Sequence, residues 1–516
     1  MADPPVQPAP IDSIHPTPSR LTDDERAAFI EKLGQEQVRF DDTDRLMHSV
    51  GRSYRDAVRA WVGRIDPVTD AVLYPKNEAD VAAALEIARQ SGIAVVPFGG
   101  GTSVVGGVEP RTGPHHAVIT LDTMHLNRIT MDHTSLLAEI GAGAFGPEIE
   151  HTLNEAGFTL GHFPQSFEFS ALGGWIASRG AGQQSTQYGK IEEIIQAIRI
   201  ATPAGRIETR NVPAAASGPS VLQSVIGSEG TAGVITSATA RIQPLPEKTQ
   251  YAAFLVPTFD AGCQLLRRLA QCEPTPSVVR LADAEETRWL SKASAGQLSL
   301  TLRIGKALIR RSMRRRGFDE SQTCMALLSF AGNRSVVKLG VRQARAIAAD
   351  LDAISIGASP GRRWERDRFR LPYLRDELLS RRVMIDTLET ATTWTNLPTL
   401  YDAVRHAIDE AMRRAGHPGA ITCHLSHIYP TGSSLYFTFL ARQVPGREIE
   451  QWQQIKNAAT AAILAHHGTL SHHHGIGYEH QPLSAEHGSV AVAAMAGAKT
   501  ALDPTGIMNP GKLLAD

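Results

Sequence analysis

The segment that most constrains the fold is "VVPFGGGTSVVGG" at residues 95–107, where five glycines follow an apolar, β-branched run. Glycines spaced this closely let backbone N–H groups approach and bind an anion. The segment is no dinucleotide fingerprint, because the following "VEPRTGPHHAVITLD" lacks the pattern of a helix. It is no Walker loop either, since it contains no lysine. A flexible hairpin is the alternative interpretation of this loop taken alone.

Two further glycine-rich segments favour a ligand over a hairpin. "SALGGWIASRGAG" at residues 170–182 offers Ser170 as a helix cap, followed by small residues that permit close backbone approach. "GSEGTAGVIT" at residues 227–236 offers another turn beside a strand. Three separate turns rich in N–H groups suit a large ligand with a diphosphate better than a single phosphate.

The pattern around these turns predicts α/β organisation. Thr22 and Asn77 are expected to cap helices that end at Gly34 and Gly92. Strands are expected over residues 71–75, 93–98, 117–122 and 136–143, with a hairpin that turns at residues 203–205. The proline-rich start, "MADPPVQPAP", is predicted to be disordered and has no signal-peptide pattern.

Length and composition narrow the class of protein. A chain of 516 residues predicts two domains, and 42% hydrophobic with 20% charged residues is typical of an ordinary globular protein. A formal net charge of -1 gives no reason to expect a nucleic-acid partner. The four cysteines form no CxxC pair and no zinc spacing, which favours a reduced, cytoplasmic setting. No apolar stretch is long enough to span a bilayer.

Four motifs of the first half carry a resemblance to a known family. "PFGGGTS", "QSFEFSALGGWIASRGAG", "YGKIEEII" and "SEGTAGVIT" resemble, in order and spacing, the vanillyl-alcohol-oxidase-type FAD-binding domain. The resemblance implies an α+β fold, with a two-subdomain FAD-binding domain plus an α+β cap domain. We expect an N-terminal tail with helices (1–65), the FAD-binding domain (66–245), the cap (246–460) and a C-terminal segment that returns to the flavin (461–516).

The same resemblance implies which residues bind FAD and that the cofactor is held non-covalently. His115, His116 and His162 lie in this domain, but we expect no tether to a histidine. The implied FAD-binding residues are Pro97, Phe98, Gly99, Gly100, Gly101, Thr102, Ser103, Gln165, Ser166, Ser170, Gly173, Gly174, Ser178, Arg179, Gly180, Ala181, Glu229, Gly230, Thr231, Gly233, Val234, Ile235 and Asn509.

Motifs of the second half resemble a particular branch, the alkyldihydroxyacetonephosphate synthases. They are "ETATTW" at 389–394, "CHLSHIY" at 423–429 and "SHHHG" at 471–475. The resemblance implies an enzyme of ether lipid synthesis, which exchanges the acyl chain of acyl-dihydroxyacetone phosphate for a fatty alcohol. It further implies a transient adduct between the substrate and flavin N5, so that the cofactor carries the covalent chemistry.

The family's catalytic positions correspond to Arg375, Tyr436, His472, His473 and His474. Arginine can bind a carboxylate or phosphate with two hydrogen bonds, and the alternative is a surface ion pair with Asp376. Tyr436 can transfer a proton if its neighbours lower its pKa, and the alternative is a tyrosine of the core. The histidines suit proton transfer or phosphate binding, although at least one of three in a row is expected to face solvent.

A second function remains open from the sequence, that of an FAD-linked D-2-hydroxy-acid dehydrogenase or oxidase. "IMNPGKLL" resembles the end of that sister group, and Phe163 and Gln165 stand where the synthases usually have acidic residues. That sister group often binds a metal through histidines and a glutamate, but His473 replaces the carboxylate here. We therefore predict no metal, with a zinc site of His424, His427 and His473 as the alternative.

A basic segment, "RIGKALIRRSMRRRGF" at 303–318, raises the question of membrane contact. Ile304, Leu308 and, less regularly, Met313 are expected to line one face of a helix. Our hypothesis is peripheral contact with an anionic membrane, at the inner face, because a fatty alcohol must leave a bilayer. The alternative is a solvated helix.

The family resemblance also implies a homodimer and a lipid-like small-molecule substrate.

Overall fold

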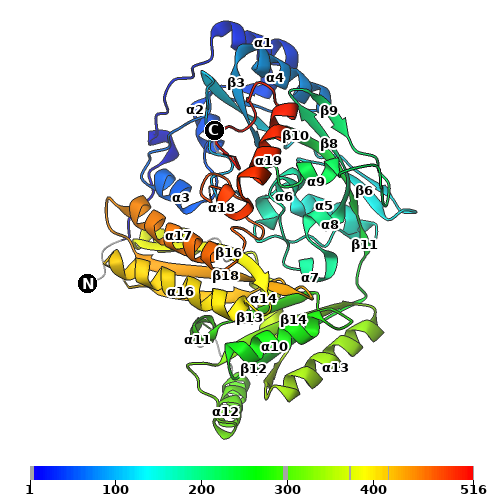
Figure 1. The fold of residues 1–516 in the computed structure, drawn as a ribbon, viewed down its shortest axis with the longest axis vertical. Coiled ribbons are helices and arrows are strands. Elements are labelled where there is room, and N and C mark those ends of the chain that lie inside the picture. The colour runs from blue at the N-terminus through cyan, green and yellow to red at the C-terminus, as the bar shows by residue number, and fades with distance from the viewer. Residues whose placement is uncertain (1–4, 294–299, 371–373, 417, 481, 515–516) are drawn as a thin grey trace. The chain divides into compact units, whose positions relative to one another are not determined.

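The computed structural model describes residues 5–293, 300–370, 374–416, 418–480 and 482–514 (Figure 1). The chain divides into two compact units. Unit 1 consists of Met1–Ala181, Lys190–Pro244 and His473–Asp516, and unit 2 of Gly182–Gly189 and Leu245–His472. The N-terminal helices thus belong to unit 1, and residues 461–472, which we expected in the C-terminal segment, belong to unit 2.

The first sheet of unit 1 has the strand order β1-β2-β4-β3. Its strands are β1 (Val38–Arg39), β2 (Ala71–Leu73), β3 (Ile93–Phe98) and β4 (Ala117–Asp122). β2 and β3 both pair parallel to β4, because α4 (Glu78–Ser91) forms the crossover. As predicted, the Asn77 side chain caps α4 and Gly92 ends it in the left-handed conformation. The N-terminal helices are α1 (Asp23–Leu33), α2 (Asp42–Met47) and α3 (Tyr54–Trp61).

The second sheet of unit 1 has the order β5-β6-β10-β8-β9, with every pair antiparallel. The strands are β5 (Ile129–Asp132), β6 (Leu137–Gly141), β8 (Ile195–Thr202), β9 (Gly205–Glu208) and β10 (Val234–Arg241). A two-stranded pair joins β7 (Phe158–Thr159) to β11 (Gln243–Pro244). The accompanying helices are α5 (Gly146–Glu155), α6 (Leu172–Ala177), α8 (Ile191–Ile194) and α9 (Val221–Val225). Ile140, Trp175 and Ile198 belong to the core that this sheet forms with its helices.

The C-terminal segment of unit 1 returns to the first sheet. After α18 (Ser484–His487) and α19 (Ser489–Leu502), the chain runs beside β3, where Figure 1 shows its red end near the blue strands. Val95 donates its N–H to Ile507 O, and its carbonyl accepts from the N–H of Asn509. Buried Ile507 and Met508 join the core of the first sheet, so this segment is an integral part of unit 1.

Unit 2 is built on an antiparallel sheet of order β15-β12-β14-β13-β17-β18-β16. The strands are β12 (Lys248–Val256), β13 (Val278–Ala282), β14 (Cys324–Gly332), β15 (Ile354–Gly357), β16 (Val383–Thr393), β17 (Ala420–Leu425) and β18 (Gly432–Arg442). The helices are α7 (Ser185–Tyr188), α10 (Phe259–Ala270), α11 (Ala284–Ala293), α12 (Leu300–Arg315), α13 (Arg334–Asp350), α14 (Ser359–Asp367), α15 (Leu374–Ser380), α16 (Leu397–Arg414) and α17 (Glu448–Ala465).

Successive side chains along each strand of this sheet point to opposite faces. Gly262 of α10 faces Leu281, Gly340 of α13 faces Phe330, and Tyr401 of α16 stacks on Phe437. The strand register places Leu281, Phe330 and Phe437 on one face, which these helices therefore cover. The residues between them in sequence point to the opposite face.

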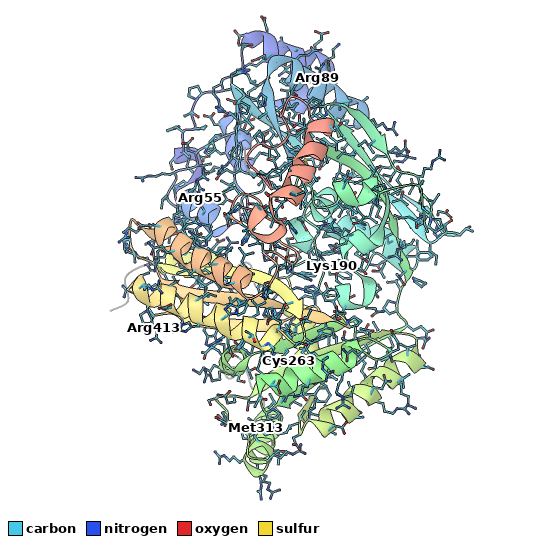
Figure 2. The ribbon with its side chains drawn as sticks, in the orientation of Figure 1. Arg55, Arg89, Lys190, Cys263, Met313 and Arg413 are labelled. Carbon is cyan, nitrogen blue, oxygen red and sulfur yellow. The ribbon has the colours of Figure 1, made fainter. Side chains whose placement is uncertain are left out.

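The basic helix α12 departs from the expected pattern. Met313, labelled in Figure 2, is buried, whereas Leu308 is 63% exposed, so the two do not share an apolar face. Met313 instead anchors the end of α12 to the rest of unit 2. The side chain of Ile304 lies outside the described part of the structure. No helix among the described residues has both the length and the apolar composition that crossing a membrane requires.

Candidate functional site

The glycine loop after β3 lies against the segment that precedes α6. A Cβ atom on Gly100 would lie 1.6 Å from the carbonyl oxygen of Phe169, so only glycine fits there. The Phe98 ring lies 4.7 Å from the ring of His48, and a Cβ on Gly101 would meet it at 2.5 Å. The loop is therefore fixed by close packing on both sides, as a preformed anion-binding loop requires.

Ser170 does not cap α6 as we predicted. The cap position is Ala171, and the Ser170 hydroxyl donates to Ser166 O at 2.9 Å and accepts from Trp175 Nε1 at 2.7 Å. This hydroxyl therefore fixes the turn before α6, and the first two N–H groups of the helix, those of Leu172 and Gly173, donate to the carbonyl oxygens of Ala144 and Ala142. A Cβ on Gly174 would meet no protein atom within 4 Å, so this turn of α6 borders open space.

The "EGT" turn is tied to the C-terminal segment through its glutamate. Glu229 adopts a positive φ of 50°, and its carboxylate accepts from the N–H groups of Ile476 at 2.6 Å and Gly477 at 2.7 Å. Burial raises the pKa of Glu229 to about 7, although both donors favour the ionised form. A Cβ on Gly230 would lie 3.1 Å from Pro97, which brings this turn next to the first loop.

Asn509 joins these segments. Its Nδ2 donates to Gly107 O at 3.0 Å and to Glu229 O at 2.7 Å. Its Oδ1 is buried and has no hydrogen-bond partner within the described ranges. Such an acceptor is costly to bury unless a ligand completes it, so the site fits a polar cofactor that supplies a donor.

His162 gives a second indication of a ligand. The ring is fully buried, lies 4.8 Å from the Trp175 ring, and finds no hydrogen-bond partner for either nitrogen among the residues that the structure describes. Burial lowers the pKa of His162 to about 3, so the ring is neutral. A neutral ring offers one donor and one acceptor to a bound group.

Unit 1 brings all three predicted turns together, but several side chains serve the protein rather than a ligand. The hydroxyls of Ser178 and Thr231 donate to the backbone carbonyls of Gly174 and Ser228. The Arg179 guanidinium donates to the carbonyl oxygen of Gln223 in α9 and to that of Ile226, directly after α9. Contact with a cofactor would therefore come chiefly from backbone groups. The other implied residues lie in the first loop (Gly99, Thr102, Ser103), in or around α6 (Gln165, Gly173, Gly180, Ala181), and just before or at the start of β10 (Gly233, Val234, Ile235).

A polar row crosses the face of the unit 2 sheet that lies opposite to α10, α13 and α16. His424 of β17 lies directly opposite Tyr436 of β18, and Tyr436 lies opposite Glu389 of β16. The His424 and Tyr436 rings stack with centroids 4.9 Å apart. Arg280 of β13 reaches the same row, with its Nη2 3.1 Å from His424 Nδ1. Four adjacent strands thus present an arginine, a histidine, a tyrosine and a carboxylate in line.

Glu286 holds the basic end of this row. Its carboxylate forms an ion pair with Arg280 and lies 3.2 Å from His424 Nδ1. Despite its burial, the neighbouring Arg280 and His424 lower the pKa of Glu286 to about 2, so it remains ionised. The pair orients Arg280 along the sheet face.

Tyr436 does not meet the condition that we attached to it from the sequence. Its hydroxyl donates to Thr387 Oγ1 at 3.1 Å. Burial raises the pKa of Tyr436 to about 12, and the carboxylates of Glu389 and Asp386 act in the same direction. The phenol therefore keeps its proton at neutral pH, and it presents a donor rather than a base.

The segment that leads to the three histidines runs along β16. Thr469 donates its N–H to Ala391 O at 3.2 Å, and Glu389 accepts from Ser471 Oγ at 2.7 Å and from the N–H of His472 at 2.5 Å. His472 Nε2 lies 2.7 Å from the Tyr429 hydroxyl. Of the predicted histidines, His472 is thereby placed in a defined hydrogen-bond network within unit 2.

His427 and His424 have different surroundings. His427 lies beyond the end of β17, where its Nε2 is 3.0 Å from Gly182 O and its Nδ1 is 2.9 Å from Ser426 Oγ. Its ring centroid lies 5.0 Å from that of His472. His424 instead belongs to the polar row.

The remaining predicted residues, Arg375, His473 and His474, are divided between the two units. Arg375 is half-buried in the first turn of α15, which packs on β16. His473 and His474 begin the last part of unit 1, with ring centroids 4.4 Å apart. Sequence reasoning missed Arg280, Glu286, Glu389 and Tyr429 as site residues, because they meet only in the folded sheet and a single polar residue gives no sequence signal of its own.

Comparison with known proteins identifies the family. Residues 69–210 match the family described as FAD binding domain, and residues 245–513 match FAD linked oxidases, C-terminal domain. The alkyldihydroxyacetonephosphate synthase of Dictyostelium discoideum is 32% identical over 98% of this chain and 83% of its own length. This chain belongs to the alkyldihydroxyacetonephosphate synthase family.

Two further comparisons agree with this assignment. The synthase of Trypanosoma brucei brucei is 35% identical, over 94% of this chain and 80% of its own. A solved alkyldihydroxyacetonephosphate synthase structure superposes with a TM-score of 0.86 at 29% identity, covering 99% of this chain and 89% of that one. The vanillyl-alcohol-oxidase-type fold and FAD as cofactor, both expected from the sequence, are confirmed.

Proposed function

We propose that this chain is an alkyldihydroxyacetonephosphate synthase, which replaces the acyl chain of acyl-dihydroxyacetone phosphate by a fatty alcohol. The observation that carries the proposal is the polar row Arg280–His424–Tyr436–Glu389 in a chain whose relatives above 30% identity are named as this enzyme. Bound FAD would supply the covalent chemistry of the exchange. The N–H-rich turns of unit 1 would hold FAD non-covalently, with Asn509 and His162 completing polar contacts.

The protein residues would bind the substrate and move protons. Tyr436, which keeps its proton, would turn its hydrogen bond from Thr387 Oγ1 to an oxygen of the substrate. The entering alcohol must lose a proton, and we assign its acceptance to His472. Arg375 would bind the leaving carboxylate or the phosphate, since a guanidinium matches both in geometry. His473 and His474 would assist in binding the anionic substrate.

The test is an exchange assay on the purified flavoprotein. Acyl-dihydroxyacetone phosphate with a labelled long-chain alcohol should yield labelled ether product and free fatty acid, while the flavin absorption remains that of oxidised FAD. The alternative is an FAD-linked D-2-hydroxy-acid dehydrogenase. Bleaching of the flavin by D-2-hydroxy acids without oxygen, together with no ether product, would overturn the synthase proposal in favour of that enzyme.

We also propose peripheral contact with an anionic membrane through residues 303–318, on the cytoplasmic side of the inner membrane. Arg310, Arg311, Arg314 and Arg315 of α12 are exposed, and so is Leu308. Because Met313 is buried, attraction to anionic headgroups would dominate over insertion. Binding to anionic vesicles at low salt and its loss at high salt would support this contact.

A homodimer is proposed from the family, and sedimentation velocity of the holoenzyme tests it.

A further inference from the structure

We propose that Glu389 and Tyr429 are positioning residues, which together hold the imidazole of His472 in one orientation for proton transfer. The inference rests on the proposed function for the identity of the reaction. The residues involved lie within unit 2, and the sequence predicted no role for either Glu389 or Tyr429. A ring on a loop rotates freely unless hydrogen bonds restrict it, and restricted rings transfer protons more efficiently.

Glu389 fixes the backbone that carries the ring. Glu389 is only 2% exposed. Its two carboxylate oxygens accept hydrogen bonds from two consecutive residues, one bond to each oxygen. Oε1 accepts from the Ser471 hydroxyl and Oε2 from the His472 N–H. Hydrogen bonds to a charged acceptor are roughly twice as strong as neutral ones. The start of the histidine segment is thereby tied to β16, beside the strand that carries Tyr436.

Tyr429 fixes the ring itself through the hydrogen bond between its hydroxyl and His472 Nε2 at 2.7 Å. Its own backbone is held in a tight turn, because its N–H donates to Gly432 O at 2.8 Å and its carbonyl accepts from Trp394 Nε1 at 3.0 Å. The phenol therefore approaches His472 from a rigid position. Because a phenol hydroxyl can donate or accept, this hydrogen bond holds the orientation of the ring in either tautomer.

The neighbouring ring of His427 completes the enclosure. It lies 5.0 Å from the His472 ring and is itself fixed by Gly182 O and Ser426. His472 is thus held from its backbone by Glu389, at Nε2 by Tyr429, and beside one face by a second imidazole. Loss of Glu389 or Tyr429 would leave the ring present but remove one of the restraints on its orientation.

A double-mutant cycle on the holoenzyme tests this inference. Tyr429→Phe and Glu389→Gln should each lower kcat for the exchange about tenfold, with KM changed less than about threefold. The reason is that both residues act by orienting the His472 imidazole and not by binding substrate. In a His472→Gln background, neither substitution should lower kcat further. Losses that multiply with that of His472→Gln would overturn the inference.

Tyr401→Phe provides a matched control. It removes a tyrosine hydroxyl that donates to buried Asp283 at 3.1 Å, elsewhere in unit 2. This substitution should lower the melting temperature without lowering kcat, and its effects should be independent of His472→Gln. If Tyr429→Phe and Tyr401→Phe behave alike, Tyr429 has only a structural role and the inference fails.

A spectroscopic measurement separates this inference from the proposed function. In holoenzyme labelled with ¹⁵N-histidine, His472→Gln should remove one ring signal and so assign it. Tyr429→Phe should shift the Nε2 resonance of that signal, and Glu389→Gln should broaden it. An unmoved and equally sharp signal in both variants overturns the inference even if exchange activity is present. A shifted signal in a protein without exchange activity supports the positioning role and rejects only the proposed reaction.

Discussion

Asn509 Nδ2 donates to the carbonyl oxygen of Glu229 at 2.7 Å, across 280 residues of sequence. Because the same amide also donates to Gly107 O, a single side chain joins the first glycine loop, the "EGT" turn and the C-terminal segment. If FAD binds at these turns as proposed, its affinity should depend on how well residues 503–514 are docked on unit 1.

Replacement of Asn509 by aspartate should weaken FAD binding. The substitution keeps the size and the tolerance for the positive φ of 41°, but it removes the donor and leaves two carbonyl oxygens unpaired. Unpaired buried groups cost about 1–3 kcal/mol each, so the Kd of FAD should rise at least tenfold in a titration of apoprotein. Asn457→Asp, on the exposed surface of α17, is the matched control and should leave the Kd unchanged. Equal affinities in both variants would contradict the linking role.

Gly100→Ala should yield a protein that lacks flavin. The added methyl group would lie 1.6 Å from Phe169 O, a backbone atom that cannot rotate away, so the loop must move out of its binding conformation. The ratio of absorbance at 450 nm to that at 280 nm after gel filtration measures the loss. Gly497→Ala is the control, because a Cβ there meets no atom within 4 Å in helix α19. A yellow Gly100→Ala protein with wild-type flavin content would refute the assignment of this loop.

The buried carboxyl of Glu229 should make the stability of the protein fall as pH rises. Its pKa is raised to about 7, so the folded state favours the protonated form. The contribution of Glu229 to the free energy of unfolding is complete below the ordinary glutamate pKa and is lost as pH rises through about 7. The total loss is up to about 3 kcal/mol. Relative to Glu229→Gln, the wild type should therefore lose melting temperature between pH 5 and pH 8. Exposed Glu155→Gln should show no such difference.

The helix, strands and loop around the first glycine-rich segment could be predicted because their signals are local. Glycines after a β-branched run, and the cap at Asn77, act within a few residues, and the structure has the loop, helix and strands there. The polar row of unit 2 could not be predicted in this way. His424, Tyr436 and Glu389 meet only through the pairing of β17 with β18 and of β18 with β16, and register between strands depends on the whole sheet. Met313 likewise turned inward because tertiary packing outweighed helical periodicity.

Arg375→Ala should impair catalysis without loss of flavin. Arg375 lies in α15 of unit 2, so its removal should not disturb the FAD turns of unit 1. A lost charge-assisted hydrogen bond costs about 1.5–3 kcal/mol, and KM for acyl-dihydroxyacetone phosphate should therefore rise at least tenfold. Arg381→Ala, which removes an exposed ion pair with Glu377, should leave KM unchanged. Loss of flavin from Arg375→Ala would instead show a structural role.

Tyr436→Phe tests the protonated tyrosine at the centre of the polar row. The ring and its stacking on His424 remain, while the donor at the phenol oxygen is lost. The kcat of exchange should fall by roughly 10²–10³-fold with flavin content unchanged, as for removal of a hydrogen-bond donor that stabilises charge on the reacting substrate. Because the pKa of Tyr436 is about 12, wild-type activity should show no decline from its ionisation between pH 7 and pH 10. A wild-type rate in Tyr436→Phe would remove this residue from the mechanism, and the row would then act through Arg280 and His424 alone.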